Sequence, residues 1–113
     1  MKLEAFRGRL DSLILAVLED EPLHGYGIVT ALRTRSDGAL DLPSGTIYPA
    51  LRRLERAGFL SSQWSVEDGR KRRTYSLTPR GRSELTNERN SWRDFTRVVE
   101  GVLGTGPAST THR

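Results

Sequence analysis

The chain has 113 residues, enough for one domain with one modest hydrophobic core. It contains no cysteine, which excludes disulfides, thiolate metal sites and cysteine nucleophiles. Its formal net charge of +4 is unevenly distributed: residues 1–43 carry −2, residues 44–82 carry +6 and residues 83–113 carry 0. Any polyanionic ligand is therefore expected to bind the middle of the chain.

The first predicted element is a helix over residues 6–18. Its apolar residues recur at the spacing of one helical face: Phe6, Leu10, Leu13, Ile14, Val17 and Leu18. The longest uninterrupted apolar run, residues 13–18, is far shorter than the roughly 20 residues that cross a bilayer. The N-terminus also lacks the pattern of a signal peptide. We therefore expect no membrane segment and a cytoplasmic location.

A second helix is predicted over residues 23–34, after an acidic turn at residues 19–22. Ile28, Val29 and Leu32 stand at helical spacing in this segment, which is shorter than the first. A loop that ends near Pro43 follows.

The third predicted helix covers residues 44–58 and has an unusual start. Its apolar stripe consists of Ile47, Ala50, Leu51 and Leu54, and its opposite face carries Pro49, Arg52, Arg53 and Arg56. If Thr46 is the N-cap, Pro49 takes the third helical position and costs nothing; if Ser44 is the cap, one hydrogen bond is lost. A rigid tip with short side chains and free amides suits insertion into a groove beside an anion. The alternative is a proline that merely fixes the entry angle of a structural helix.

Residues 59–78 predict a β-hairpin around an Asp68-Gly69 turn. On alternation, one face of the first strand carries Leu60, Trp64 and Val66, and the matching face of the return strand carries Tyr75 and Leu77. Four consecutive cations are then expected at or beside the tip: Arg70, Lys71, Arg72 and Arg73. Phosphates would relieve their mutual repulsion, whereas a solvated charge cluster is the alternative.

A last helix is predicted over residues 79–103, because Thr78-Pro79 is a strong helix-start signal. Its large apolar residues follow a heptad pattern that Glu88 interrupts: Leu85, Trp92, Phe95, Val99 and Val102. We expect this seam to mediate self-association, although it could instead pack onto its own domain. Residues 104–113 are rich in Gly, Ser, Thr and Pro and are expected to be a disordered tail.

Three segments of the sequence resemble the PadR family of transcriptional regulators. They are "HGYGI" at 24–28, "SGTIYPALRRLERAGFL" at 44–60 and "GRKRRTYSLTPRGR" at 69–82. Gly27 and Thr74 depart from the family pattern, which commonly has a larger residue at the first position and an aromatic residue at the second. The resemblance implies a mainly α fold with a small β-hairpin. It comprises a winged helix-turn-helix domain at residues 1–78, a dimerisation helix at residues 79–103 and the tail.

The resemblance also implies a function: a homodimeric regulator, a repressor, that binds double-stranded DNA sequence-specifically at a pseudo-palindromic operator. The third helix would enter the major groove and the hairpin would contact the backbone or the minor groove. Mapped onto this sequence, the DNA-binding residues would be Tyr26, Ser44, Thr46, Tyr48, Pro49, Arg53, Arg70, Lys71, Arg72 and Arg73. The length of the third helix implies that at least one of Arg52, Arg53 and Arg56 contacts phosphate or solvent rather than bases. Tyr48 could equally be a buried hinge between helices.

The resemblance further suggests that a small effector binds at the dimer interface and releases DNA. A planar aromatic molecule could stack on Trp92, with Phe95 and Phe6 as walls of the site. The alternative is that Trp92 simply belongs to the packed seam.

The sequence offers no pattern for catalysis or for metal binding. Its two histidines, His24 and His112, lie far apart, so we expect no enzyme activity, no metal and no other cofactor. The rival function from another class is a winged-helix module that binds proteins and not DNA. The concentration of basic residues in the middle of the chain weighs against it.

Overall fold

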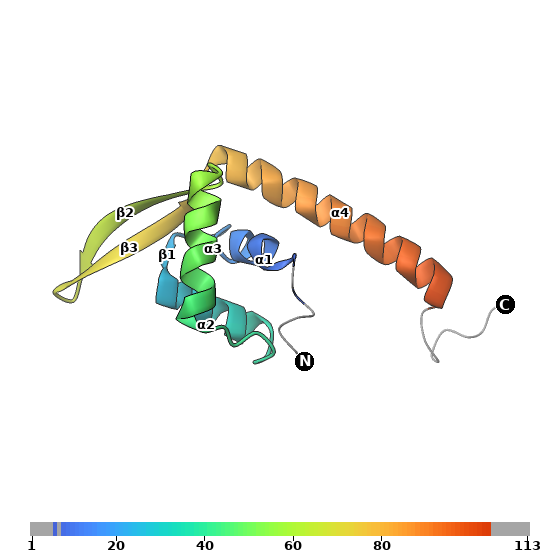
Figure 1. Cartoon of the computed structure of the whole chain (residues 1–113), viewed down its shortest axis with the longest axis horizontal. Helices are drawn as coiled ribbons and strands as arrows, with labels where there is room; N and C mark the ends of the chain where they lie inside the picture. The colour runs from blue at the N-terminus through green and yellow to red at the C-terminus, as the bar shows by residue number, and fades with distance from the viewer. Residues whose placement is uncertain (1–5, 7, 105–113) are drawn as a thin grey trace.

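The computed structural model describes residue 6 and residues 8–104 of the chain. In chain order the elements are α1 (Leu10–Val17), β1 (Leu23–His24), α2 (Gly25–Arg35), α3 (Ser44–Arg56), β2 (Leu60–Glu67), β3 (Arg70–Leu77) and α4 (Pro79–Leu103). Figure 1 shows the three shorter helices gathered at the centre, with the β2–β3 hairpin extending to one side and α4 to the other. The predicted class, mainly helical with a small β element, is confirmed. The predicted tail, apart from Gly104, lies outside the described residues.

The hydrophobic core lies where α1, α2 and α3 meet the base of the hairpin. The apolar stripes expected on the first and third helices are buried there, which explains why these segments become helices. The largest fully buried side chains are Ile14, Leu15, Leu18, Ile28, Ile47 and Leu51. Leu40 and Leu42, from the loop before α3, complete the same cluster.

Helix α1 is shorter than predicted. It begins at Leu10, because Gly8 has a positive φ of 83° and the Arg9 amide closes a turn by donating to the Phe6 carbonyl at 2.8 Å. Phe6 fits the apolar spacing of the helix although it lies before α1, because its side chain packs against the core from this turn.

The start of the second predicted helix is instead a strand. Leu23 pairs with Tyr75 and His24 with Thr74, so β1 joins the hairpin in a three-stranded antiparallel sheet of order β1-β3-β2. A strand of two residues is too short to show alternation, which is why the sequence did not reveal it. Helix α2 then begins at Gly25, where the His24 Nδ1 accepts a hydrogen bond from the Gly27 amide at 3.1 Å.

Helix α3 begins earlier than either predicted alternative. Its N-cap is Pro43, whose carbonyl accepts from the amides of Thr46 and Ile47, so neither Ser44 nor Thr46 caps the helix. Pro49 therefore lies inside the helix, in its second turn, and removes the amide that would bond to the Gly45 carbonyl. The backbone beside Gly45 is exposed, so water can satisfy that carbonyl and the cost stays small.

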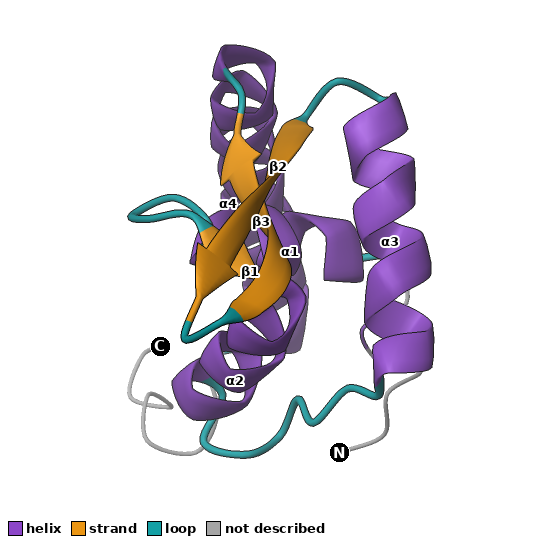
Figure 2. Cartoon of the chain, turned by 90° about the vertical axis from the view of Figure 1, so that its left-hand side faces the viewer, coloured by secondary structure: helices purple, strands orange, loops and turns teal. Residues whose placement is uncertain are grey.

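We call the β2–β3 hairpin the wing. Its turn is Asp68-Gly69, where both residues have positive φ, and its register pairs Leu60 with Leu77 and Trp64 with Arg73. The predicted sharing of faces is therefore confirmed. The four consecutive cations lie along β3 beside the turn, with Lys71 and Arg73 on the opposite face from Arg70 and Arg72. In Figure 2, which looks toward the wing, α3 stands to one side of the sheet and α2 below it.

The first half of α4 packs against α1, and its second half projects beyond the domain (Figure 1). As predicted, Pro79 follows a capping Thr78, whose side chain accepts from the Gly81 amide at 3.0 Å. Leu85, expected in the dimerisation seam, is 3% exposed and belongs to the core, because α1 covers this part of the stripe. Glu88 interrupts the seam because its carboxylate accepts a 2.6 Å hydrogen bond from Ser12 of α1.

Candidate nucleic-acid interface

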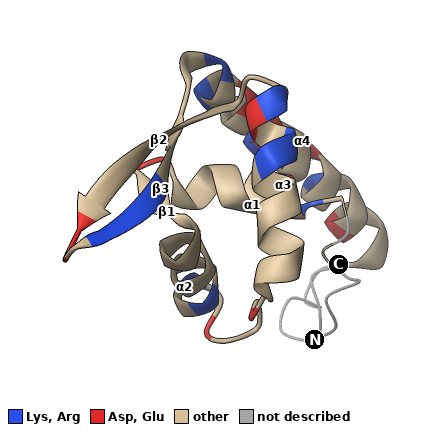
Figure 3. Ribbon diagram, turned by 60° about the vertical axis from the view of Figure 1, so that its left-hand side comes forward, with Lys and Arg blue, Asp and Glu red and all other residues tan. Residues whose placement is uncertain are grey.

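The exposed side of α3 brings together most of the residues predicted to enter a DNA groove. Ser44, Tyr48 and Pro49 are exposed and Thr46 is half-buried, all within the first two turns. The first turn contains no acidic residue. A helix start of this kind can approach an anion closely, since its free amides carry partial positive charge. Figure 3 shows cationic residues further along the same helix and on the wing.

Tyr48 is not a buried hinge, although it does contact a second helix. Its side chain is 41% exposed, yet its ring lies over the start of α2, where a Cβ added at Gly25 would come within 2.5 Å of the Tyr48 hydroxyl. A glycine at position 25 therefore permits this close approach. Tyr26, in the next position of α2, is exposed and stacks on His24 with ring centroids 6.4 Å apart.

Arg53 does not point toward the tip of α3. Its guanidinium forms a double contact with Asp11 of α1, with Nη2 at 2.5 Å from Oδ1, and both side chains are partly exposed. Such a pair is worth little in solution and can open, but in this structure it holds the Arg53 guanidinium against α1. Arg52 and Arg56 are exposed and form no ion pair within the described residues, which agrees with the expectation that at least one of the three α3 arginines contacts phosphate or solvent. Their i, i+4 spacing was the signal that they share one face.

The four wing cations fall into two kinds. Arg70 and Lys71 are exposed near the turn. Arg72 is half-buried, with its Nη1 at 2.9 Å from the Nε2 of His24, and its Nε has no hydrogen-bond partner within the described residues. Arg73 lies over the ring of Trp64 at 5.3 Å and 3.8 Å from the Glu55 carboxylate. Of the four wing cations predicted to contact DNA, Arg72 and Arg73 therefore lie against other side chains of the same chain.

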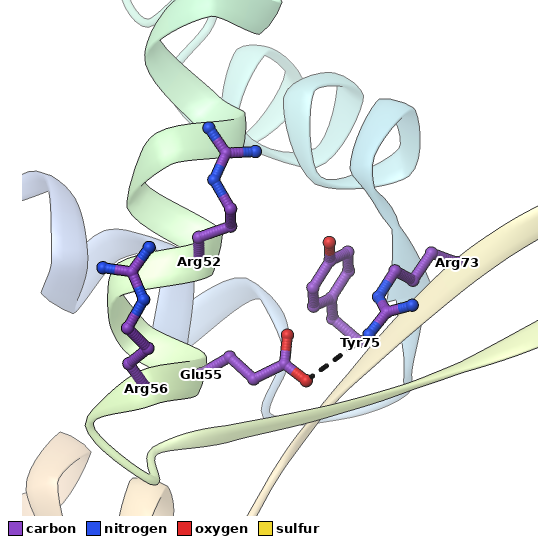
Figure 4. A pocket seen from close by; sticks show the side chains of 5 residues that line it. All are labelled: Arg52, Glu55, Arg56, Arg73 and Tyr75. Carbon is purple, nitrogen blue, oxygen red and sulfur yellow. Dashed lines mark ion pairs between the residues drawn. The ribbon is translucent and has the colours of Figure 1, made fainter.

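A cleft of about 400 Å³ separates α3 from the wing (Figure 4). We call it the α3–wing cleft; its lining residues are Arg52, Glu55, Arg56, Arg73 and Tyr75. The Ser62 hydroxyl donates to the Glu55 carboxylate at 2.7 Å, which fixes this carboxylate on the wing side. Burial raises the pKa of Tyr75 above its usual value.

A second hollow, of about 740 Å³, lies between α1 and α4, and we call it the α1–α4 groove. It brings together the three predicted effector residues, Phe6, Trp92 and Phe95. Arg9 covers both of the α4 aromatics, with its guanidinium carbon 5.0 Å from the Trp92 ring centre and 5.6 Å from that of Phe95. Further along α4 the apolar stripe is open to solvent, and it includes Val98 and Leu103 in addition to the predicted residues.

Neither a metal centre nor a membrane segment is apparent in the part of the chain that the structure describes. No group of three His, Cys, Asp or Glu side chains among residues 6 and 8–104 could hold a metal ion. No described helix combines the length and the apolar character needed to cross a membrane.

Comparison with known proteins identifies the family and the fold. Residues 14–87 match the transcriptional regulator PadR-like family. The chain is 40% identical over 88 residues to the transcriptional regulator Rv3488 of Mycobacterium tuberculosis, which covers 78% of this chain and 79% of that protein. A transcriptional regulator from Clostridium thermocellum has a similar structure, with a TM-score of 0.81 and 27% identity, covering 89% of this chain and 96% of the other. A PadR family transcription regulator from Clostridium difficile gives a TM-score of 0.75 and 32% identity, covering 84% of this chain and 98% of the other. The chain therefore belongs to the PadR-like family of transcriptional regulators.

Proposed function

We propose that this regulator binds double-stranded DNA sequence-specifically as a homodimer, represses transcription from a pseudo-palindromic operator, and is released by a small planar aromatic effector. It needs no cofactor and catalyses no reaction in this role. The observation that supports the proposal most strongly is the pairing of an exposed, cation-bearing α3 with a basic wing beside it (Figure 3).

The start of α3 supports a role in reading bases. Thr46, Tyr48 and Pro49 have short or flat side chains that let the helix backbone approach a groove floor closely. Ser44 lies at the same end and Tyr26 is exposed on α2, where both could contact phosphates. Base contacts specify sequence, whereas phosphate contacts set the position of the protein on the duplex.

The wing supports a role in holding the DNA backbone. Arg70 and Lys71 are exposed and have no acidic partner within the described residues, so they are free to neutralise phosphates. Arg72 lies beside His24 and Arg73 is paired with Glu55, so both have less freedom than Arg70 and Lys71. We assign Arg72 and Arg73 to the positive field of the wing rather than to direct phosphate contacts. Arg53 would contribute to DNA binding only after its pair with Asp11 opens.

The distal half of α4 supports dimerisation. Trp92, Phe95, Val98 and Val102 are each at least half exposed, along one continuous side of the helix. Val99 is less exposed and lies within the same stripe. An apolar surface of this kind is characteristic of a helix that packs against another copy.

The proposal is tested by binding of the protein to the promoter upstream of its own reading frame. Fluorescence anisotropy with that duplex, repeated from about 50 to 200 mM salt, should give a specific affinity 10³-fold or more above that for random DNA and a steep linear dependence on salt. A winged-helix module that binds only proteins would give equally weak binding to both duplexes. That result would remove DNA recognition from the proposal.

A further inference from the structure

His24 lies where three elements meet, and the functions assigned so far do not use its side chain. It is the last residue of β1, its backbone pairs with Thr74 of β3, and it is also the N-cap of α2. Figure 2 shows β1 beside β3, with α2 below them. The half-buried side chain of His24 therefore lies between the wing and the start of α2.

The two ring nitrogens of His24 face two hydrogen-bond donors. Nδ1 accepts from the Gly27 amide at 3.1 Å, and the Nη1 of Arg72 lies 2.9 Å from Nε2. A neutral imidazole has one nitrogen that accepts and one that carries a proton. Because Nδ1 accepts from Gly27, the proton of the neutral ring is on Nε2, where it faces the guanidinium. The ring can therefore satisfy the Gly27 amide or Arg72, but not both at once.

Arg72 is held beside the ring without a compensating partner. Its Nε is buried and has no hydrogen-bond partner within the described residues. A buried donor that is left unpaired costs free energy. Arg72 therefore places a positive charge and an unsatisfied donor next to His24, an arrangement that the fold tolerates while the ring is neutral.

No negative charge faces the ring to stabilise an added proton. β1 packs against β3 and α2, and the charged side chains on the face of β3 that carries Thr74 are Arg72 and Arg70. The first turn of α2 contains no acidic residue, and Tyr26, whose ring centroid is 6.4 Å from that of His24, brings no negative charge. No ion pair among the described residues includes His24. The partial positive charge of the helix start further disfavours a cation at this position.

Protonation of His24 therefore breaks two contacts at once. The second proton occupies Nδ1, so the Gly27 amide loses its acceptor, and the ring becomes a cation beside Arg72. Both effects act on β1, which is two residues long and pairs with β3 alone. Because the paired arrangement requires a neutral ring and an open one accepts the proton freely, lowering the pH favours opening.

We propose that His24 is a proton-operated latch between α2 and the wing: its neutral imidazole joins the start of α2 to β3, and its protonation releases both. The pairing of β2 with β3, which runs from Leu60 to Glu67, does not involve His24 and stays intact. The latch goes beyond the proposed function, because it is a property of the free protein and its test uses no DNA.

Hydrogen exchange of the free protein at about pH 7.5 and about pH 5 tests the latch, in a His112→Gln background where His24 is the one remaining histidine. Exchange rates are first corrected for the intrinsic effect of pH. The protection of the Gly27 amide, and of the amides that join β1 to β3, should then fall about tenfold at the lower pH. The protection of the amides that pair β2 with β3 should not change.

His24→Asn is the matched control, because asparagine also caps a helix but takes up no proton in this range. Its protection should be the same at both pH values. Arg72→Gln separates the two contacts of the latch. In this variant the Gly27 amide should still lose protection at the lower pH, whereas the β1–β3 pair should lose less than with Arg72 present, because the opposing charge is gone.

Three results would overturn the inference. The first is that the Gly27 amide and β1 stay fully protected at the lower pH. The second is that His24→Asn loses as much protection as the chain with His24. The third is that the β2–β3 pair loses protection together with β1, because the acid would then be unfolding the sheet as a whole rather than opening a latch at His24.

Discussion

At the scale of single residues, Gly81 shows how closely α4 joins the domain. A Cβ at this position would collide with the backbone carbonyl of Phe59, which already accepts a hydrogen bond from the Thr78 amide at 3.1 Å. A backbone carbonyl cannot swing aside as a flexible side chain can. The glycine is therefore required by packing and not by its φ angle.

We predict that Gly81→Ala lowers the free energy of unfolding by about 1–3 kcal/mol, because the added methyl group overpacks this junction. Urea denaturation measures the change. Gly101→Ala, on the same helix with nothing within 4 Å of the added Cβ, should instead raise it by up to about 1 kcal/mol through helix propensity. Equal effects of the two substitutions would contradict the packing argument.

At the scale of elements, α4 is attached to the turn after α1 by charge as well as by packing. Arg89 donates twice to the Glu19 carboxylate, at 2.7 and 2.9 Å. This hydrogen bonding, with the nearby positive charge, lowers the pKa of Glu19 below its usual value. The same hydrogen bonding, with the negative charges of Glu19 and Asp20, raises the pKa of Arg89. Because the folded pKa of Glu19 is depressed, its stabilising contribution is present above pH 4.5 and is lost as pH falls through the folded value.

We predict that wild type has a higher Tm than Glu19→Gln at pH 7 and that the difference shrinks toward zero as pH is lowered to about 3. Thermal melts across this range measure it, and the effect should be small because the pair is exposed to solvent. Glu100→Gln, a substitution of a carboxylate with no ion pair within the described residues, is the control. A Tm difference that stays constant with pH would show that Glu19 acts through something other than its charge.

The wing and the recognition helix should respond differently to mutation. We predict that Lys71→Ala weakens binding to operator and random DNA about equally and lowers the salt slope by about one unit per subunit. Thr46→Ala should leave the slope unchanged and reduce discrimination between the two duplexes. Fluorescence anisotropy over a salt series distinguishes the two variants. If Lys71→Ala alone lost sequence preference, the wing would read bases and the start of α3 would contact the backbone, the reverse of this prediction.

At the scale of the whole molecule, α4 divides into a half that belongs to the domain and a half that projects from it. The proximal half is covered by α1 and contributes Leu85 to the core, whereas Phe95 and Val102 are half or more exposed. Water disfavours such an apolar surface, and a second copy packed along it would also fix the distance between two recognition helices.

We predict that the protein sediments as a dimer and that Phe95→Asp combined with Val102→Asp gives a monomer at tens of micromolar. Operator affinity should fall at least tenfold in this variant, since one half-site then binds without the other. Asn90→Asp adds a charge to the opposite side of the same helix and should leave the dimer intact. A wild-type monomer, or a dimer that survives both aspartates, would place the interface elsewhere.

The proposed effector belongs to this scale, because in the proposed dimer a ligand in the α1–α4 groove would change the spacing of the two subunits. We predict that planar aromatic molecules quench Trp92 fluorescence in a Trp64→Phe background and lower operator affinity over the same concentration range. Trp92→Leu should then be a dimer that no longer responds. Quenching without any change in operator affinity would leave Trp92 as a packing residue.

The sequence by itself determined the features that depend on local patterns. Helical spacing located α1, α3 and α4, the Thr78-Pro79 pair marked the start of α4, and Asp68-Gly69 marked the turn of the wing. These signals are readable because cap, period and turn chemistry lie within a few neighbouring residues. The concentration of cations in residues 44–82 likewise required no structure.

Only the tertiary structure decided how those residues are shared among partners distant in sequence. It paired β1 with β3, drew Arg53 to Asp11 across 42 positions, placed Leu85 in the core and set Tyr75 in a cleft between α3 and the wing. The physical reason is that a side chain contacts whatever the folded chain places beside it. A sequence pattern indicates which face of an element a residue occupies, but not which residue of another element lies opposite that face.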